Sequence, residues 1–439
     1  MEVRPNEVHE VLARSMLTEG YPFVLDLERS HGQWLVDAKT GTEYLDFFTF
    51  YGSRPLRFDH PRLRGPRFAE RVARVAKLKP SNCDIYSTYY AEFVETFRVR
   101  ATTAPMKHLF FIDGGALAVE NALKTAFDWK AQKNLAAGHG EDPGVVLHFR
   151  HAFHGRSGYT LSLTNTADPR KTRWFPKFDW PRVSSPAIHF PIDEARVVAA
   201  EASALREIDE VYDRFGAHRV ACIIIEPIQA EGGDRHFRPR FLDELRRICD
   251  QRESLLIFDE VQTGFGGTGR MWAYERLGVT PDVVAFAKKA QTGGIIVGPR
   301  IDDVDSVFKV KSRISSTWAG NLIDFLRSTE ALEAIHEERL LDNARVQGDA
   351  LLAGLEQLVA SHPDRLSNAR GLGLLVAFDA PDTATRDRIL KTAQEDRLLV
   401  MPCGDRSVRL RPALDVSAAD VAAGLELLTR SVARALDSP

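Results

Sequence analysis

Residues 255–294 read LLIFDEVQTGFGGTGRMWAYERLGVTPDVVAFAKKAQTGG and contain two short apolar runs, LLIF and VVAFA, that both end in charged side chains. Asp259 and Glu260 follow the first run, and Lys288 and Lys289 follow the second. Runs of this length, bounded by loops and helical segments, are typical of buried strands in a largely parallel α/β sheet. Because such sheets bind ligands at the carboxyl ends of their strands, this stretch predicts a site that combines a carboxylate with a lysine.

The same alternation of apolar runs and helical segments extends over residues 80–321. HLFFID, VVLHFR and VACIIIEP are further apolar runs, and FLDELRRICDQR has a helical period. We therefore expect an α/β fold in which this region forms a large domain around a mostly parallel central sheet. Residues 1–79 contain a hairpin pattern, GQWLVDAKTGTEYLDFF, and residues 322–439 contain a long amphipathic stretch followed by GLGLLVAFDA and VRLRPAL. These two segments are expected to build a smaller α+β domain.

The composition excludes several classes of protein. The chain has 439 residues, of which 44% are hydrophobic and 27% are charged, as in globular proteins of more than one domain. Lys and Arg number 58 against 61 Asp and Glu, so no basic excess favours nucleic acid or an anionic membrane. The four cysteines form no CxxC pair, the first residues lack an apolar signal core, and no run approaches the ~18 apolar residues of a membrane span. We expect a cytoplasmic protein with neither a nucleic-acid nor a membrane partner.

The charged strand ends allow two interpretations. Asp259 and Glu260 could merely cap the following turn, and Lys288 and Lys289 could be a solvated surface pair. Alternatively, a lysine at a partly desolvated strand end loses its proton readily, as an amine must before it forms a Schiff base with an aldehyde.

A glycine pair precedes a helical pattern in HLFFIDGGALAVENALKTAF. Gly115 and Ala116 would lie at the helix start, where free N–H groups and the positive end of the helix dipole receive a phosphate, although a glycine pair can also serve only a tight turn. A phosphate site, a strand-end carboxylate and a strand-end lysine are together what pyridoxal phosphate needs. The lysine carries the aldehyde, the carboxylate keeps the pyridine nitrogen protonated, and the helix start anchors the phosphate. The combination predicts an enzyme that uses pyridoxal 5'-phosphate.

DEVQTGFG followed by PDVVAFAKKAQTGG resembles the fold-type I, class III pyridoxal-phosphate aminotransferases, and the resemblance extends over nearly the whole chain. It implies that Lys288, which the small residue Ala287 precedes, is the Schiff-base lysine rather than Lys289. By the same resemblance, Asp259 would contact the pyridine nitrogen, and Gln262 would reach the ring hydroxyl.

Further family positions match elsewhere in the chain. Gly115 and Ala116 match the phosphate-binding helix start, and Phe153 in AFHGR occupies the position whose ring stacks on the cofactor. Thr317 in SSTWAGN resembles the threonine that reaches the phosphate of the neighbouring subunit. The resemblance thus implies a homodimer whose active sites are shared across the interface.

The substrate-facing positions resemble those of ω-aminotransferases. Arg156 resembles the arginine that holds the distal carboxylate, and Arg409 in VRLRPAL matches the one that takes the α-carboxylate of glutamate. Glu231 in EPIQAEGGD occupies the position of a glutamate that can pair with Arg409 while a lysine-like donor is bound and swing away for glutamate. AFHGRSGYTLSLTNT and FPKFDWPR look most like lysine ε-aminotransferases. This implies the reaction of L-lysine with 2-oxoglutarate to 2-aminoadipate 6-semialdehyde and L-glutamate.

Two alternatives stay open. The donor could be another ω-amino compound, such as ornithine, 4-aminobutyrate or diaminobutyrate, because Ser315 and Ala319 depart from the family pattern near the expected dimer-facing side of the pocket. A metal-dependent enzyme of a different class would use His148, His151 and His154, which recur every third residue. On a strand, however, that spacing sends neighbouring members to opposite faces.

Overall fold

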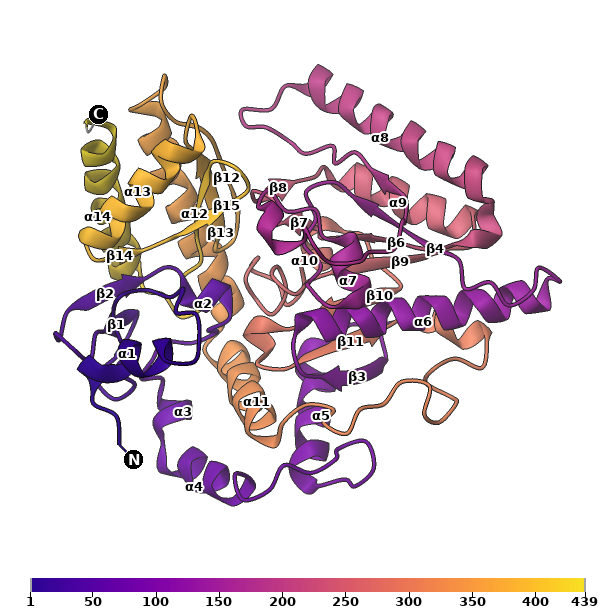
Figure 1. The fold of residues 1–439 in the computed structure, drawn as a ribbon, viewed down its shortest axis with the longest axis horizontal. Coiled ribbons are helices and arrows are strands. Elements are labelled where there is room, and N and C mark those ends of the chain that lie inside the picture. Colours follow the sequence, from indigo (N-terminus) through magenta and orange to yellow (C-terminus); the bar gives the residue numbers. More distant parts are fainter. Residues whose placement is uncertain (1, 438–439) are drawn as a thin grey trace.

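Seven strands form the central sheet of the larger part of the molecule, in the order β3-β11-β10-β9-β6-β4-β5 (Figure 1). The structure is a computed structural model, and it describes residues 2–437. The strands are β3 (His108–Ile112), β4 (Val145–Phe149), β5 (Arg182–Val183), β6 (Val220–Ile225), β9 (Leu255–Asp259), β10 (Val283–Phe286) and β11 (Gly293–Val297). Strand β11 runs antiparallel to both of its neighbours, and the other pairs are parallel. The predicted α/β fold with a mostly parallel sheet is confirmed.

Helices cover both faces of this sheet. Successive strand residues point to opposite faces, and both sets are apolar, so both faces have to be buried. Leu255 and Ile257 of β9 belong to a core that includes the apolar residues of α6, whereas Leu256 and Phe258 belong to the core that includes α5, α9 and α11. The covering helices are α5 (Thr88–Ala101), α6 (Gly115–Ala136), α8 (Glu194–Phe215), α9 (Pro239–Gln251) and α11 (Leu322–Glu337). A sheet that is buried on both faces in this way presents its strand ends to ligands.

The smaller part combines the two ends of the chain, and Figure 1 shows the indigo and yellow segments side by side. Its sheets are β12-β13-β16-β15 and β1-β2-β14. Leu398 of β14 pairs in parallel with Leu45 of β2, which joins the C-terminal segment to the N-terminal hairpin. The elements are β1 (Trp34–Val36), β2 (Glu43–Asp46), α12 (Leu340–Ala360), β12 (Ser367–Leu372), β13 (Leu375–Asp379), α13 (Thr383–Glu395), β14 (Leu398–Leu399), β15 (Met401–Cys403), β16 (Ser407–Leu410) and α14 (Ala418–Asp437). The expected smaller α+β part built from both ends is therefore present.

Local patterns predict most of these elements. The hairpin pattern forms β1 and β2, with Trp34 opposite Leu45 and the turn residue Gly41 at φ 75°. The long amphipathic stretch after residue 322 is two helices, α11 and α12, because the chain turns at Arg339, which has φ 55°. Helix α11 packs against α5 of the larger part as well as against α12, so the division of the chain at residues 79 and 321 stays a prediction.

Shorter elements complete the fold. They are α1 (Val8–Ala13), α2 (Thr49–Gly52), α3 (Pro61–Arg64), α4 (Pro66–Val75), α7 (Gly158–Leu163), α10 (Ala273–Leu277) and the small hairpin of β7 (Ile228–Gln229) with β8 (Arg235–His236). None of the helices within residues 2–437 is long and apolar enough to cross a membrane.

Candidate active site

A cavity of about 1320 Å³, here called the strand-end cavity, opens where β6, β9 and β10 end. The sequence-predicted residues that line it are Gly115, Ala116, Phe153, Arg156, Glu231, Asp259, Gln262, Lys288 and Arg409. Thr317 is exposed and lies outside the strand-end cavity. Segments that are far apart in the sequence thus meet at one edge of the sheet, as the strand-end rule predicts.

Asp259 is fixed in orientation by two hydrogen bonds. It is the last residue of β9 and is 4% exposed. His154 Nδ1 lies 2.7 Å from one carboxylate oxygen of Asp259, and the N–H of Val261 donates to the other at 3.0 Å. A buried carboxylate that receives an imidazole N–H is held in one rotamer and keeps its charge close to the cavity.

Glu226 is a second buried carboxyl group at a strand end, directly after β6. It accepts the backbone N–H groups of Phe153 at 2.8 Å and Ala230 at 3.1 Å. Burial, followed by the nearby charge of Asp259, raises the pKa of Glu226 well above its ordinary value, which favours the neutral acid. Glu226 is not among the residues predicted from the sequence, although the strand-end rule that predicts Asp259 also applies to the residue after VACIII.

The two adjacent lysines differ in position. Lys288 lines the strand-end cavity, and burial, followed by the positive charge of Arg409, lowers its pKa to about 8. Lys289 is buried outside this cavity, its Nζ has no hydrogen-bond partner within residues 2–437, and burial lowers its pKa to about 7. Lys288 is thus the lysine that reaches the cavity, with an amine that loses its proton readily.

The start of α6 has the form of a phosphate site. Gly114, at φ 83°, precedes the helix and provides no side-chain cap, so the first N–H groups of the helix face the cavity without an intrahelical acceptor. A Cβ atom on Gly115 would meet Cγ1 of Val261 at 2.8 Å, which explains the requirement for glycine at this position. Together with Lys288 and Asp259, this helix start fits the aldehyde, ring nitrogen and phosphate of pyridoxal phosphate.

Phe153 and Gln262, which the family resemblance assigns to the cofactor ring, both line the strand-end cavity. The ring centroid of Phe153 is 5.8 Å from Nζ of Lys171, which also lines the cavity. The side-chain amide of Gln262 donates to the carbonyl oxygen of Tyr51 at 2.9 Å, a contact that ties α2 to the loop after β9. Tyr51 therefore belongs to the wall of the cavity, which the sequence did not indicate.

The residues expected to contact the substrate, Arg156, Glu231 and Arg409, all line the strand-end cavity. Arg409 on β16 is buried, and its Nε and one terminal nitrogen, Nη1, have no hydrogen-bond partner within residues 2–437. In the described residues, Glu231 forms no ion pair with Arg409. Its carboxylate accepts hydrogen bonds from Lys171 Nζ at 2.6 Å and from Thr166 Oγ1 at 2.9 Å. A cation and a hydroxyl in direct contact hold the carboxylate more firmly than a distant arginine does. Arg156 is exposed at the cavity wall.

The alternative of a metal site on the histidines is not supported. His154 is engaged with Asp259, His148 lies 3.4 Å from the carbonyl oxygen of Ser162, and His151 lines a different cavity. Across residues 2–437 no three histidine, cysteine or acidic side chains are close enough together to hold a metal ion. The spacing of three residues therefore sends the histidines to separate environments.

The chain matches the family profile of class-III aminotransferases over residues 16–432. It is a class-III aminotransferase. A curated L-lysine-epsilon aminotransferase from Mycobacterium tuberculosis is 50% identical over 426 residues, which cover 96% of this chain and 94% of that protein. The enzyme of the same name from Streptomyces clavuligerus is 48% identical and covers 98% of this chain and 95% of its own.

A solved structure of lysine aminotransferase from M. tuberculosis in the internal aldimine form superposes on this class-III aminotransferase with a TM-score of 0.97. The two chains are 49% identical, and the match covers 99% of this chain and 100% of the other. The predicted fold-type I architecture and the predicted cofactor, pyridoxal 5'-phosphate, are confirmed by this family membership.

Proposed function

We propose that this aminotransferase moves the ε-amino group of L-lysine to 2-oxoglutarate, giving 2-aminoadipate 6-semialdehyde and L-glutamate. The observation that carries the proposal is that Arg156, Arg409 and Glu231 line one cavity with Lys288. Two guanidinium groups suit the two carboxylates of glutamate. A donor with a single carboxylate leaves one guanidinium without a partner, and the carboxylate of Glu231 can take that place. The identity of about half the residues to lysine-epsilon aminotransferases supports lysine as that donor.

The residues at the strand ends have separate tasks in this reaction. When bound, pyridoxal phosphate supplies an aldehyde that condenses with amines and a ring that takes up electrons. Asp259, oriented by His154, is placed to keep a proton on the ring nitrogen. The start of α6 offers its N–H groups to the phosphate. Lys288 is suited to move a proton at the reacting carbon of the substrate, because a pKa of about 8 lets its amine change charge near neutral pH.

Donor selection rests on the position of Glu231. With Glu231 on Lys171 and Thr166, Arg409 is free to take the α-carboxylate of glutamate. When lysine is the donor, no substrate carboxylate reaches Arg409. Glu231 then turns to pair with Arg409, and this pairing neutralises the buried charge of the guanidinium. The same pocket can thereby accept an α-amine from one substrate and a terminal amine from the other.

We also infer that the enzyme acts as a cytoplasmic homodimer in which Thr317 of each chain serves the phosphate site of the other. In support, Leu78, Ile85 and Tyr86 are large apolar side chains that are more than 70% exposed. Lys79 Nζ lies 4.5 Å from the ring of Trp318, so this apolar segment and the segment of Thr317 are neighbours on the surface. Exposed apolar patches of this kind mark interfaces.

The Glu231→Ala variant tests the lysine assignment. It should slow the half-reaction with L-lysine far more than the half-reaction with L-glutamate, because only lysine leaves Arg409 without a carboxylate. Each half-reaction is followed in single-turnover experiments by the visible absorption of the cofactor, with ornithine, 4-aminobutyrate and diaminobutyrate as alternative donors. Equal losses in both half-reactions would contradict the proposed role of Glu231, and a faster reaction with another donor would contradict the choice of lysine.

A further inference from the structure

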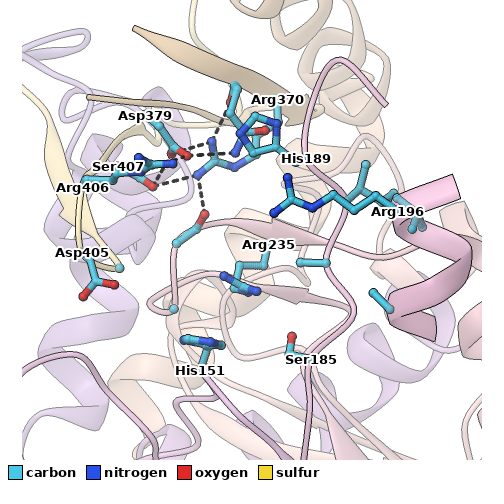
Figure 2. A pocket seen from close by; sticks show the side chains of 18 of the residues that line it. His151, Ser185, His189, Arg196, Arg235, Arg370, Asp379, Asp405, Arg406 and Ser407 are labelled. Carbon is cyan, nitrogen blue, oxygen red and sulfur yellow. Dashed lines mark hydrogen bonds and ion pairs between the residues drawn. The ribbon is translucent and has the colours of Figure 1, made fainter. Parts of the chain in front are cut away.

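A second cavity, of about 630 Å³, lies between the two parts of the molecule and is here called the interdomain cavity (Figure 2). The larger part lines it with the β4–α7 loop, the β5–α8 loop, the start of α8 and strand β8, and the smaller part with β12, β13 and β16. It has a different set of functional side chains from the strand-end cavity, with which it shares Ala167, Gly404 and Asp405. Cavities of this volume at domain junctions are where small ligands bind.

Arginine side chains from four separate elements face the interdomain cavity. They are Arg196 on α8, Arg235 on β8, Arg370 on β12 and Arg406 in the turn before β16. These four guanidinium groups outnumber the carboxylates that line the same cavity, which belong to Asp193, Asp379 and Asp405. The lining therefore carries an excess of positive charge, and clefts of one sign concentrate ligands of the opposite sign.

Two of the four arginines already have structural partners. Arg370 lies 2.9 Å from a carboxylate oxygen of Asp379 and donates to the backbone carbonyl of Asp234 at 2.8 Å and to the hydroxyl of Ser407 at 2.8 Å. Arg406 lies 3.8 Å from the other oxygen of Asp379. Figure 2 shows this network at one side of the cavity. These two side chains build the wall and leave Asp379 little capacity to pair with anything else.

The other two arginines, Arg196 and Arg235, have no side-chain hydrogen bond or ion pair within residues 2–437. In Figure 2 both reach into the open space, in the region bounded by His189 and His151. The Nε of Arg235 is fully shielded from solvent and yet has no acceptor. Arg235 as a whole is half-buried, but a shielded N–H without an acceptor is costly, so an anion that enters the cavity and accepts this hydrogen bond would stabilise the position.

The surrounding groups agree with an anionic occupant. Asp193 is used as the N-cap of α8, where it accepts the N–H of Arg196 at 3.0 Å. Asp405 is exposed, and its charge, like that of Asp379, acts on Arg235 without forming an ion pair with it within residues 2–437. Burial lowers the pKa of His151, and the charge of Arg235 adds to this effect. Burial lowers the pKa of His189 in the same way. Both rings are thus neutral near pH 7 and offer N–H donors without further charge.

We propose that the interdomain cavity is a binding site for a small oxyanion, a phosphate or a dicarboxylate, that Arg235 and Arg196 hold between the two parts of the molecule. The planar fork of a guanidinium matches the paired oxygens that phosphate and carboxylate share. Both arginines belong to the larger part, so the ligand is held from that side and lies beside the wall that the smaller part forms.

The test is isothermal titration calorimetry of the holoenzyme with inorganic phosphate in one arm and succinate in the other, at constant ionic strength. We expect one of these anions to bind, and which one binds identifies the chemistry of the ligand. Arg235→Gln and Arg196→Gln should each weaken binding about tenfold or more, because each removes a charge-assisted hydrogen bond. Arg196 is exposed, so its variant folds even if the Arg235 variant does not.

Arg240→Gln is the matched control, because this arginine is 69% exposed at the start of α9 and lies outside both cavities. It should bind the anion as the wild type does. The proposal is overturned if neither anion binds, if binding survives unchanged in Arg196→Gln, or if Arg240→Gln weakens it equally. Succinate can also bind to Arg156 and Arg409 in the strand-end cavity, so only the part of the binding heat that Arg196→Gln removes is assigned to the interdomain cavity. That difference does not depend on the proposed aminotransferase substrate.

Discussion

Replacing Lys171 with methionine should shift the enzyme away from glutamate. Lys171 Nζ lies 2.6 Å from the carboxylate of Glu231, and 33% of the lysine side chain and 24% of the glutamate side chain are exposed. In the Lys171→Met variant the Glu231 carboxylate loses its cation and retains the hydrogen bond from the hydroxyl of Thr166. The carboxylate then turns to Arg409, whose guanidinium has free donors in the same cavity.

The size of the effect follows from the burial of the pair. An exposed ion pair contributes up to ~1 kcal/mol, and a hydrogen bond to a charged group contributes about 1.5–3 kcal/mol. A partly buried pair lies between these limits, at about 1–2 kcal/mol, which corresponds to about a 5- to 30-fold change in an equilibrium. We therefore expect the KM for L-glutamate and for 2-oxoglutarate to rise about 5- to 30-fold in the Lys171→Met variant, while the kcat/KM for L-lysine stays within about twofold.

The assay compares the two half-reactions by stopped-flow absorbance, and Lys177→Met is the control. Lys177 is on the same loop, but it is exposed, and its Nζ donates to the carbonyl oxygen of Thr172. The double variant Lys171→Met/Glu231→Gln shows whether Lys171 acts through Glu231, because the effect of losing Lys171 should then disappear. Equal losses in both half-reactions, or an effect of undiminished size in the double variant, would refute the reasoning.

Four further predictions concern the cofactor site. Asp259→Asn should lower kcat about 100- to 1000-fold while the cofactor stays bound, because the ring nitrogen loses its anionic partner although His154 remains. Steady-state kinetics measure this change, and a loss of less than tenfold would be inconsistent with the prediction. Because burial lowers the pKa of Lys288 to about 8, the rate at which the apoenzyme attaches the cofactor covalently should rise with pH up to about 8 and then level off, whereas an ordinary lysine would give a rise up to about 10.5. Between about pH 8 and pH 10.5, Lys288 keeps its proton in the unfolded chain but loses it in the folded apoenzyme. The free energy of unfolding of the apoenzyme should therefore rise with pH across this interval. Mixed dimers of Thr317→Ala and Lys288→Ala chains should regain activity that neither variant has alone, because one of the two shared sites is intact; no recovery on mixing would mean that the sites are not shared.

The strand-end residues could be predicted from the sequence because their signals are local. LLIF and VVAFA are apolar runs of strand length, and in a parallel sheet the residues that follow such runs share one edge. The pattern therefore predicts that Asp259 and Lys288 lie at the same edge. The start of α6 was found for a similar reason, since the glycines stand directly before a helical period. The same rule, applied to VACIII, would also have found Glu226.

The partners of the substrate-binding residues could not be predicted in the same way. Lys171 and Thr166 belong to the connection between α7 and β5, which contains the short 3-10 helix Pro169–Lys171. The sequence of this connection has neither strand nor helix periodicity, so nothing local indicates that the two residues meet Glu231. The direction of β11 was equally hidden, because an apolar run such as GGIIV has the same pattern in either orientation. Such features depend on how distant segments pack, and they required the structure.

The most direct test of the lysine aminotransferase assignment is the visible absorption spectrum of the purified holoenzyme during sequential addition of L-lysine and 2-oxoglutarate. We predict that L-lysine abolishes the absorption band of the covalently attached cofactor and that 2-oxoglutarate restores it, with 2-aminoadipate 6-semialdehyde and L-glutamate as products. A band that L-lysine leaves unchanged, while ornithine or 4-aminobutyrate abolishes it, would contradict the assignment of the donor.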